Sequence, residues 1–238
     1  MLVGLRIAEE YNDNGYLIYA DNFPGAYVRG RYEEEALAKL KNEICQYILW
    51  RDDKWNEIDI NIIVVDRKKS KLNIEDADSD IIFTSEKEPL TQEEYLTLKG
   101  LALKSAADFQ TMYDSIPDKV NPKLAARRTF YGLMPKTAEE MYLHTKNVNS
   151  YYFGEIGIEA DNEPDIFTCR KRGFEKLETY TNYLGIGVKL GSYNEEWSLR
   201  KLLRRFIWHD RIHAKSMYRM ACNLWGKEYV ENPFRFVI

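Results

Sequence analysis

The sequence has few of the residues that build disulfide frameworks, thiolate zinc sites or membrane spans. Its three cysteines, Cys45, Cys169 and Cys222, are odd in number, far apart and free of Cys-x-x-Cys spacing, which argues against both kinds of site. No segment approaches the roughly 18 consecutive apolar residues of a membrane helix, and the amino terminus has no basic region followed by an apolar one. We therefore expect a soluble cytoplasmic protein with reduced thiols and no membrane partner.

Composition limits the fold and the partners. The formal net charge of −4 argues against a chain built to bind nucleic acid. Hydrophobic residues make up 45% of the chain, which is enough for a sizeable core. With 238 residues, the chain exceeds a typical single domain of roughly 100–150 residues. Two domains are expected.

Residues 1–67 predict a small α+β domain. Two apolar strings, 2–8 and 16–20, flank a turn cluster at 12–15 that suits a hairpin, and a short strand should follow. From Glu33 the period becomes helical, and a β-branched string at 58–65 predicts a final strand. One helix across a small antiparallel sheet would bury the apolar faces of both.

Short motifs in this region resemble the HicB-like antitoxin fold. They are Gly15-Tyr16, Phe23-Pro24-Gly25-Ala26, Arg29-Gly30 and Glu33-Glu34-Glu35-Ala36-Leu37. The resemblance covers about a quarter of the chain. It implies a domain that sequesters a partner protein, but the DNA-binding segment that commonly accompanies this fold has no counterpart here. The alternative is an accessory domain that packs on the rest of the chain or forms a homodimer.

Residues 68–88 are rich in charge and are expected to form a linker, with one short strand at 81–84. Residues 89–238 predict four helices. Thr91-x-x-Glu94 and Thr137-x-x-Glu140 are capping boxes that open the first two, which should begin near 91 and 137. The third is expected over 166–184, and Ser198 can cap the fourth.

The chain contains only three histidines, and all three lie on apolar helical stripes. His144 shares the stripe of the second helix, while His209 and His213 are four residues apart on the fourth. Such a pair lies roughly 5–6 Å apart at Cβ, and a helix bundle can add the third imidazole from a facing helix. We predict that His144, His209 and His213 bind one divalent metal ion. The alternative is three unrelated core histidines, each hydrogen-bonded to a tyrosine or a carboxylate.

Three protein ligands leave at least one coordination position open, which suits a catalytic or substrate-binding ion. A metal-bound thiol or water loses its proton readily and becomes a nucleophile at neutral pH. Asp210 and Tyr142 adjoin ligands in the sequence, but neighbours on a helix point to different faces, so neither is predicted to be a catalytic base.

The helical half resembles the DinB-like four-helix-bundle metalloproteins. The matching segments are Leu90-Thr91-x-Glu93-Glu94, Thr137-Ala138-Glu139-Glu140-Met141-x-x-His144 and a stretch from Glu196 to His213 that ends in His209-x-x-x-His213. The resemblance spans about 150 residues. It implies an all-α bundle in which the three histidines hold a nickel or zinc ion and a low-molecular-weight thiol is activated for transfer to an electrophile.

The expected function is therefore a metal-dependent thiol S-transferase. A regulatory or binding protein that uses the HicB-like domain, and a metal-dependent hydrolase, are the alternatives. A cationic stripe on the fourth helix could attract an anionic substrate, although salt bridges with the 38 acidic residues are the commoner fate of such a stripe. Its members are Lys201, Arg204, Arg211, Lys215 and Arg219.

Overall fold

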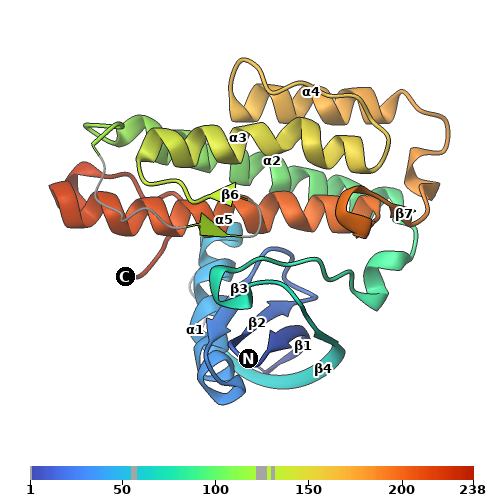
Figure 1. The fold of residues 1–238 in the computed structure, drawn as a ribbon, viewed down its shortest axis with the longest axis horizontal. Coiled ribbons are helices and arrows are strands. Elements are labelled where there is room, and N and C mark those ends of the chain that lie inside the picture. The colour runs from blue at the N-terminus through green and yellow to red at the C-terminus, as the bar shows by residue number, and fades with distance from the viewer. Residues whose placement is uncertain (1, 55–57, 122–127, 130–131) are drawn as a thin grey trace.

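The protein combines an N-terminal sheet and helix with a helical C-terminal half (Figure 1). The computed structural model describes residues 2–54, 58–121, 128–129 and 132–238. The mixed α+β class predicted from the sequence is confirmed. Within the described ranges, no helix combines the length and the apolar run needed to cross a bilayer.

The N-terminal sheet has four strands in the order β3-β2-β1-β4, with one helix between β3 and β4. The elements are β1 (Leu2–Asn12), β2 (Gly15–Ala20), β3 (Tyr27–Gly30), α1 (Glu33–Asp52) and β4 (Asp59–Lys69). β2 pairs antiparallel with β1 and with β3, but β4 pairs parallel with β1. The prediction of an antiparallel sheet is therefore wrong for β4. The reason is the helical crossover, because α1 carries the chain to the far edge and β4 then runs in the direction of β1.

Alternating side chains bury both faces of this sheet, as the period of two requires. Leu5, Ile7 and Ile18 belong to the core that includes α1. Leu17 and Tyr19 point to the other face, where they form a second cluster with residues from the 74–83 segment and from the C-terminal half. The other members are Ala8, Tyr27, Ile74, Ala77, Ile81, Phe83 and Trp208.

Four longer helices form the C-terminal half. They are α2 (Gln92–Ser115), α3 (Ala138–Glu155), α4 (Ile166–Glu178) and α5 (Leu199–Trp225). α2 and α3 each pack against α4 and α5. α2, α3 and α5 begin where predicted. α4 ends at Glu178, before the predicted end at 184, and Asn182, with a left-handed φ of 57°, precedes a short 3-10 turn.

Short elements connect these helices and strands. The described short strands are β5 (Arg128–Thr129), β6 (Gly132–Leu133), β7 (Lys189–Leu190) and β8 (Glu196–Trp197). The 3-10 helices are η1 (Ile74–Asp76), η2 (Thr84–Lys87), η3 (Tyr183–Gly185), η4 (Ser192–Asn194) and η5 (Lys227–Tyr229). The strand predicted at 81–84 is not formed. This stretch has no sheet partner among the described residues and runs into η2, and its apolar side chains, Ile81 and Phe83, are buried.

One continuous core includes side chains from both halves of the chain. The Trp50 indole of α1 donates a 2.6 Å hydrogen bond to Asp108 of α2, and its ring stacks on Phe234. Gly25, with φ of 92°, brings the turn before β3 so close to α5 that a Cβ atom there would collide with Ile207. A larger residue at position 25 would separate the sheet from α5.

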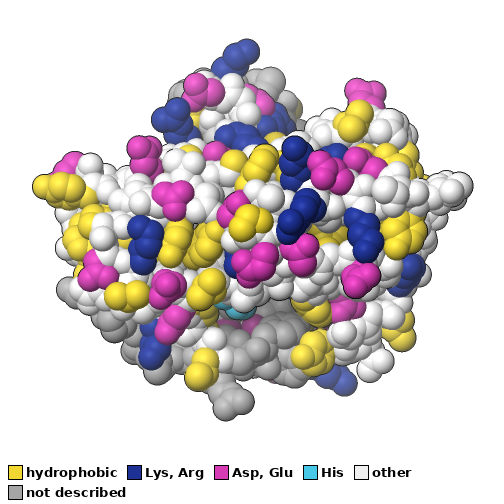
Figure 2. Space-filling model, turned by 90° about the horizontal axis from the view of Figure 1, so that it is seen from above, with side chains coloured by type: hydrophobic (Ala, Val, Ile, Leu, Met, Phe, Trp, Pro, Cys, Tyr) yellow, Lys and Arg dark blue, Asp and Glu magenta, His cyan; other side chains and the backbone are white. Residues whose placement is uncertain are grey.

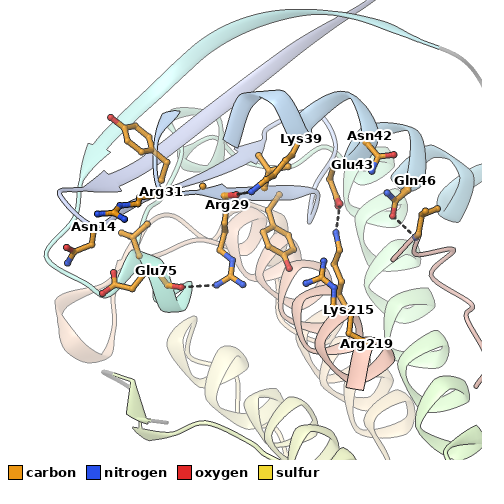
Figure 3. Close-up of a pocket in the computed structure, with 16 residues that line it drawn as sticks. Asn14, Arg29, Arg31, Lys39, Asn42, Glu43, Gln46, Glu75, Lys215 and Arg219 are labelled. Carbon is orange, nitrogen blue, oxygen red and sulfur yellow. Dashed lines mark hydrogen bonds and ion pairs between the residues drawn. The ribbon is translucent and has the colours of Figure 1, made fainter. Parts of the chain in front are cut away.

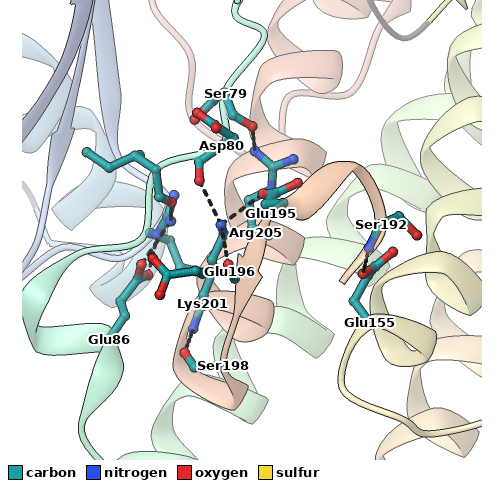
Figure 4. A network of polar contacts seen from close by, with 12 residues as sticks. Ser79, Asp80, Glu86, Glu155, Ser192, Glu195, Glu196, Ser198, Lys201 and Arg205 are labelled. Carbon is teal, nitrogen blue, oxygen red and sulfur yellow. Dashed lines mark hydrogen bonds and ion pairs between the residues drawn. The ribbon is translucent and has the colours of Figure 1, made fainter. Parts of the chain in front are cut away.

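Three cationic side chains at the start of α5 hold the 79–86 segment in place (Figure 4). Lys201 donates to the carbonyl oxygen of Asp80 at 3.0 Å, and Arg205 donates to that of Ser79 at 3.1 Å. Arg204 forms a buried ion pair with Glu86. The segment expected as a linker therefore packs against the helical half, while the domain boundaries at 67 and 89 remain a prediction.

Glu10 of β1 lies buried under the same segment. Its carboxylate accepts hydrogen bonds from the Ser79 hydroxyl at 2.5 Å and from the backbone N–H of Asp80 at 3.2 Å. Burial, followed by a hydrogen bond with the Asp80 side chain, raises the pKa of Glu10 to about 7. The folded protein thus favours the protonated carboxyl group, and ionising it costs folding free energy.

This raised pKa predicts a fall in stability as the pH rises from about 4.5, the ordinary value, through about 7. The free-energy cost of ionising Glu10 is fully present at a pH above its pKa in the folded protein. It is absent at a pH below its pKa in the unfolded chain. Glu10→Gln should reduce the loss of unfolding free energy between pH 5 and pH 8 by about 1–3 kcal/mol. Urea denaturation at pH 5 and pH 8 measures this change in unfolding free energy. The exposed Glu34→Gln is a charge-matched control. Identical pH profiles for Glu10→Gln and wild type would contradict the prediction.

Candidate metal centre

The helices α3 and α5 bring the three predicted ligands together. His144 lies on α3, and His209 and His213 lie one turn apart on α5. Both helices begin with the predicted caps, since the hydroxyl groups of Thr137 and Ser198 accept hydrogen bonds from the backbone N–H three residues later, at 3.0 and 3.1 Å. Because α3 and α5 pack against each other, their inward stripes meet.

The three imidazole rings form a compact triangle. Their centroids are 4.5 Å apart for His209 and His213, 4.7 Å for His144 and His213, and 5.0 Å for His144 and His209. The Nε2 atoms of His144 and His209 are 3.2 Å apart. One ring nitrogen from each residue lies within 4.8 Å of the other two.

These separations fit a small ion after a modest movement of the side chains. Bonds of about 2.0–2.1 Å at a tetrahedral centre would place two ligand nitrogens about 3.3–3.4 Å apart. The Nε2 atoms of His144 and His209, 3.2 Å apart, are already at this spacing. The widest separation between ligand nitrogens, up to 4.8 Å, must shorten by roughly an ångström and a half. In the part of the chain that the structure describes, the group contains no carboxylate or thiol, so it offers three nitrogen ligands.

The surroundings keep the imidazoles neutral. Burial lowers the pKa of His144 and lowers those of His209 and His213 well below the ordinary value. The neighbouring imidazoles lower the pKa of His209 further, as do the guanidinium groups of Arg205 and Arg170. Neutral imidazole is the form that binds a metal ion.

One side of the triangle is closed by aromatic rings and the other is accessible. His209 is only 7% exposed, and Tyr152 lies edge-on to its ring with centroids 5.9 Å apart. The buried Nδ1 atom of His209 has no hydrogen-bond partner among the described residues. His144 and His213 are less buried, and Figure 2 shows histidine side-chain atoms at the molecular surface. Among the described residues, this is the side from which a small molecule can approach the triangle.

Asp210 and Tyr142 point away from the triangle, as the sequence predicted. Asp210 is fully buried in an ion pair with Arg170 of α4 and accepts a 2.5 Å hydrogen bond from Ser105 of α2. The Tyr142 hydroxyl donates to Gln110 at 2.5 Å. The Arg170 partnership was not predicted from the sequence, although a charged residue on the apolar stripe of α4 could have indicated it.

The cationic stripe on α5 is mostly neutralised. Lys201 pairs with Glu195, Arg204 with Glu86, and Glu43 of α1 pairs with both Arg211 and Lys215. Arg219, the last member of the stripe, forms no ion pair with any residue in the described ranges. Salt bridging therefore explains four of the five members.

Comparison of the chain with protein-family models, with curated proteins and with solved structures finds no match. The resemblance to DinB-like and HicB-like proteins therefore rests on the motifs in the sequence, and the site must be judged by its own geometry.

The buried Arg170–Asp210 pair should support the site without binding the ion. Asp210→Ala leaves the guanidinium buried without its carboxylate, and we expect a loss of about 3–5 kcal/mol of unfolding free energy. The double variant Arg170→Leu with Asp210→Leu should recover much of the loss, because an apolar pair has no charge to desolvate. Urea denaturation compares them with Glu175→Ala, which removes an exposed acid. If Asp210→Ala is as stable as wild type, the Arg170–Asp210 pair contributes little to the unfolding free energy.

Proposed function

We propose that His144, His209 and His213 bind one divalent metal ion, with nickel or zinc as the candidates. The observation that carries the proposal is the convergence of the only three histidines in the chain on one point between two helices. Burial supports it further, because it keeps the imidazoles neutral and able to bind.

Three nitrogen ligands and an accessible side support a reactive ion rather than a closed structural one. A divalent ion held there would supply a positive charge that lowers the pKa of a thiol or a water molecule beside it. The histidines would hold the ion, and the aromatic ring of Tyr152 would exclude water from the buried side of His209.

The chain itself does not bring a thiol into the group. No cysteine belongs to the described cluster, and burial raises the pKa of the Cys169 thiol to about 11. A reacting thiol would therefore come from a small molecule. We infer that α2 to α5 form a DinB-like four-helix bundle with metal-dependent thiol S-transferase activity, and that residues 1–67 form a HicB-like accessory domain. The motif resemblance and the three-histidine geometry support this inference.

Metal analysis tests the site directly. Protein purified without a histidine tag and dialysed against nickel or zinc should contain about one ion per chain, because the described residues offer one three-histidine group. His209→Ala and His213→Ala should each weaken binding by about two orders of magnitude or more, since the loss of one of three ligands leaves an incomplete site.

Cys222→Ala serves as the matched control. Cys222 is the least buried of the three cysteines and lies on α5 with His209 and His213, so its loss should leave metal binding unchanged. A wild-type protein that stays free of metal, or histidine variants that bind as tightly as wild type, would refute the metal site. Circular dichroism spectra of each variant exclude unfolding as the cause of a loss.

The thiol chemistry has its own test. In cobalt-substituted protein, adding cysteine, glutathione or a bacillithiol-like thiol should produce a sulfur-to-cobalt charge-transfer band, because sulfur would occupy the open position. The band should be absent in His213→Ala. Cobalt uptake without any spectral change would argue against the transferase, and a hydrolase or a regulatory protein with a structural ion would then explain the site better.

A further inference from the structure

A pocket of about 550 Å³ opens between the N-terminal sheet and the C-terminal part of α5 (Figure 3). Its walls come from β3, α1, η1 and α5, so both halves of the chain contribute. The volume lies within the roughly 300–1,000 Å³ of typical small-molecule sites. None of the three histidines lines it, so it is separate from the candidate metal centre.

The lining carries more positive than negative charge. Five cationic side chains and two carboxylates line the pocket, namely Arg29, Arg31, Lys39, Lys215, Arg219, Glu43 and Glu75. Glu43 is already neutralised, because it lies 2.7 Å from Arg211 and 3.2 Å from Lys215. Lys39 is likewise paired with Glu35 at 2.6 Å. The remaining charged groups are three arginines and one glutamate.

The three arginines have no carboxylate partner in the described part of the chain. The Arg29 guanidinium donates only to the backbone carbonyl oxygen of Glu75, at 3.2 Å. The guanidinium groups of Arg31 and Arg219 form no hydrogen bond or ion pair with the residues that the structure describes. Figure 3 shows Arg29 and Arg219 entering the pocket from β3 and α5. Arg29 is partly buried, and Arg31 and Arg219 are exposed.

A neutral hydrogen-bond donor adds to this positive charge. Tyr27 is only 8% exposed and lines the same pocket, and its hydroxyl group makes no hydrogen bond with a described residue. Burial raises the pKa of Tyr27 to about 12, so the hydroxyl stays protonated at neutral pH. It can therefore donate to an anion.

We propose that this pocket binds a small phosphorylated metabolite, whose phosphate group is held by Arg29, Arg219 and Tyr27. Guanidinium groups present forked donors that match the oxygens of a phosphate, and charge-assisted bonds of this kind are about twice as strong as neutral ones. Arg31 adds positive charge at the rim. The uncharged part of the lining, which includes Tyr16, Val28 and Ile74, contacts the organic part of the ligand.

Isothermal titration calorimetry at low ionic strength tests the proposal with inorganic pyrophosphate, ADP and citrate as probes. Pyrophosphate and ADP should bind more tightly than citrate. A higher affinity for ADP than for pyrophosphate would show that the pocket also holds the organic part of the ligand. Arg29→Gln and Arg219→Gln should each weaken binding by about tenfold, because each removes charge-assisted hydrogen bonds. The exposed Arg31→Gln is a second rim variant in case Arg29→Gln unfolds.

Lys171→Gln is the matched control, since it removes one exposed positive charge from α4 and does not line the pocket. It should leave binding unchanged. The proposal is overturned if neither phosphate binds, if citrate binds more tightly than both, or if the pocket variants lose no more affinity than Lys171→Gln. Unchanged melting temperatures of the variants confirm that the loss is local.

Discussion

The burial of the charged helix α5 is the constraint on which the rest of the structure depends. Four of its basic residues, Lys201, Arg204, Arg205 and Arg211, are 5% exposed or less. Leaving such charges without partners would cost several kcal/mol each, so other segments must supply acceptors. α1 supplies Glu43, the 79–86 segment supplies Glu86 and backbone carbonyls, and the chain just before α5 supplies Glu195. Charge pairing thus fixes the sheet and the connecting segment against α5.

The same helix carries two of the three histidines, and its charges affect them. Arg205 of α5, together with Arg170 of α4, lowers the pKa of His209, which favours the neutral ring that a metal ion needs. A positive environment of this kind also favours an anion over a neutral molecule at an open coordination position, which agrees with a thiolate or a hydroxide as the proposed partner of the ion. At the other end of α5, Arg219 has no carboxylate partner among the described residues, and the pocket for an anion lies there.

Sequence patterns predicted local structure well where a local cause exists. The capping residues Thr91, Thr137 and Ser198 each accept the expected backbone hydrogen bond, and α2, α3 and α5 begin where these residues predict. The errors lie where partners are distant. The parallel direction of β4 depends on the edge to which α1 carries the chain, and the buried conformation at 81–84 depends on α5. No periodicity within a short segment contains that information.

For the site, the sequence alone placed three histidines on the inward faces of two helices, because helical period and apolar stripes are local properties. Only the tertiary structure brought His144 within 3.2 Å of His209, since this distance depends on how α3 and α5 pack. It also decided which cations are paired, which a count of acidic and basic residues cannot do. Arg29 and Arg219 are 190 positions apart, and their common pocket exists only because the sheet is held against α5 through distant contacts such as Glu43 with Arg211.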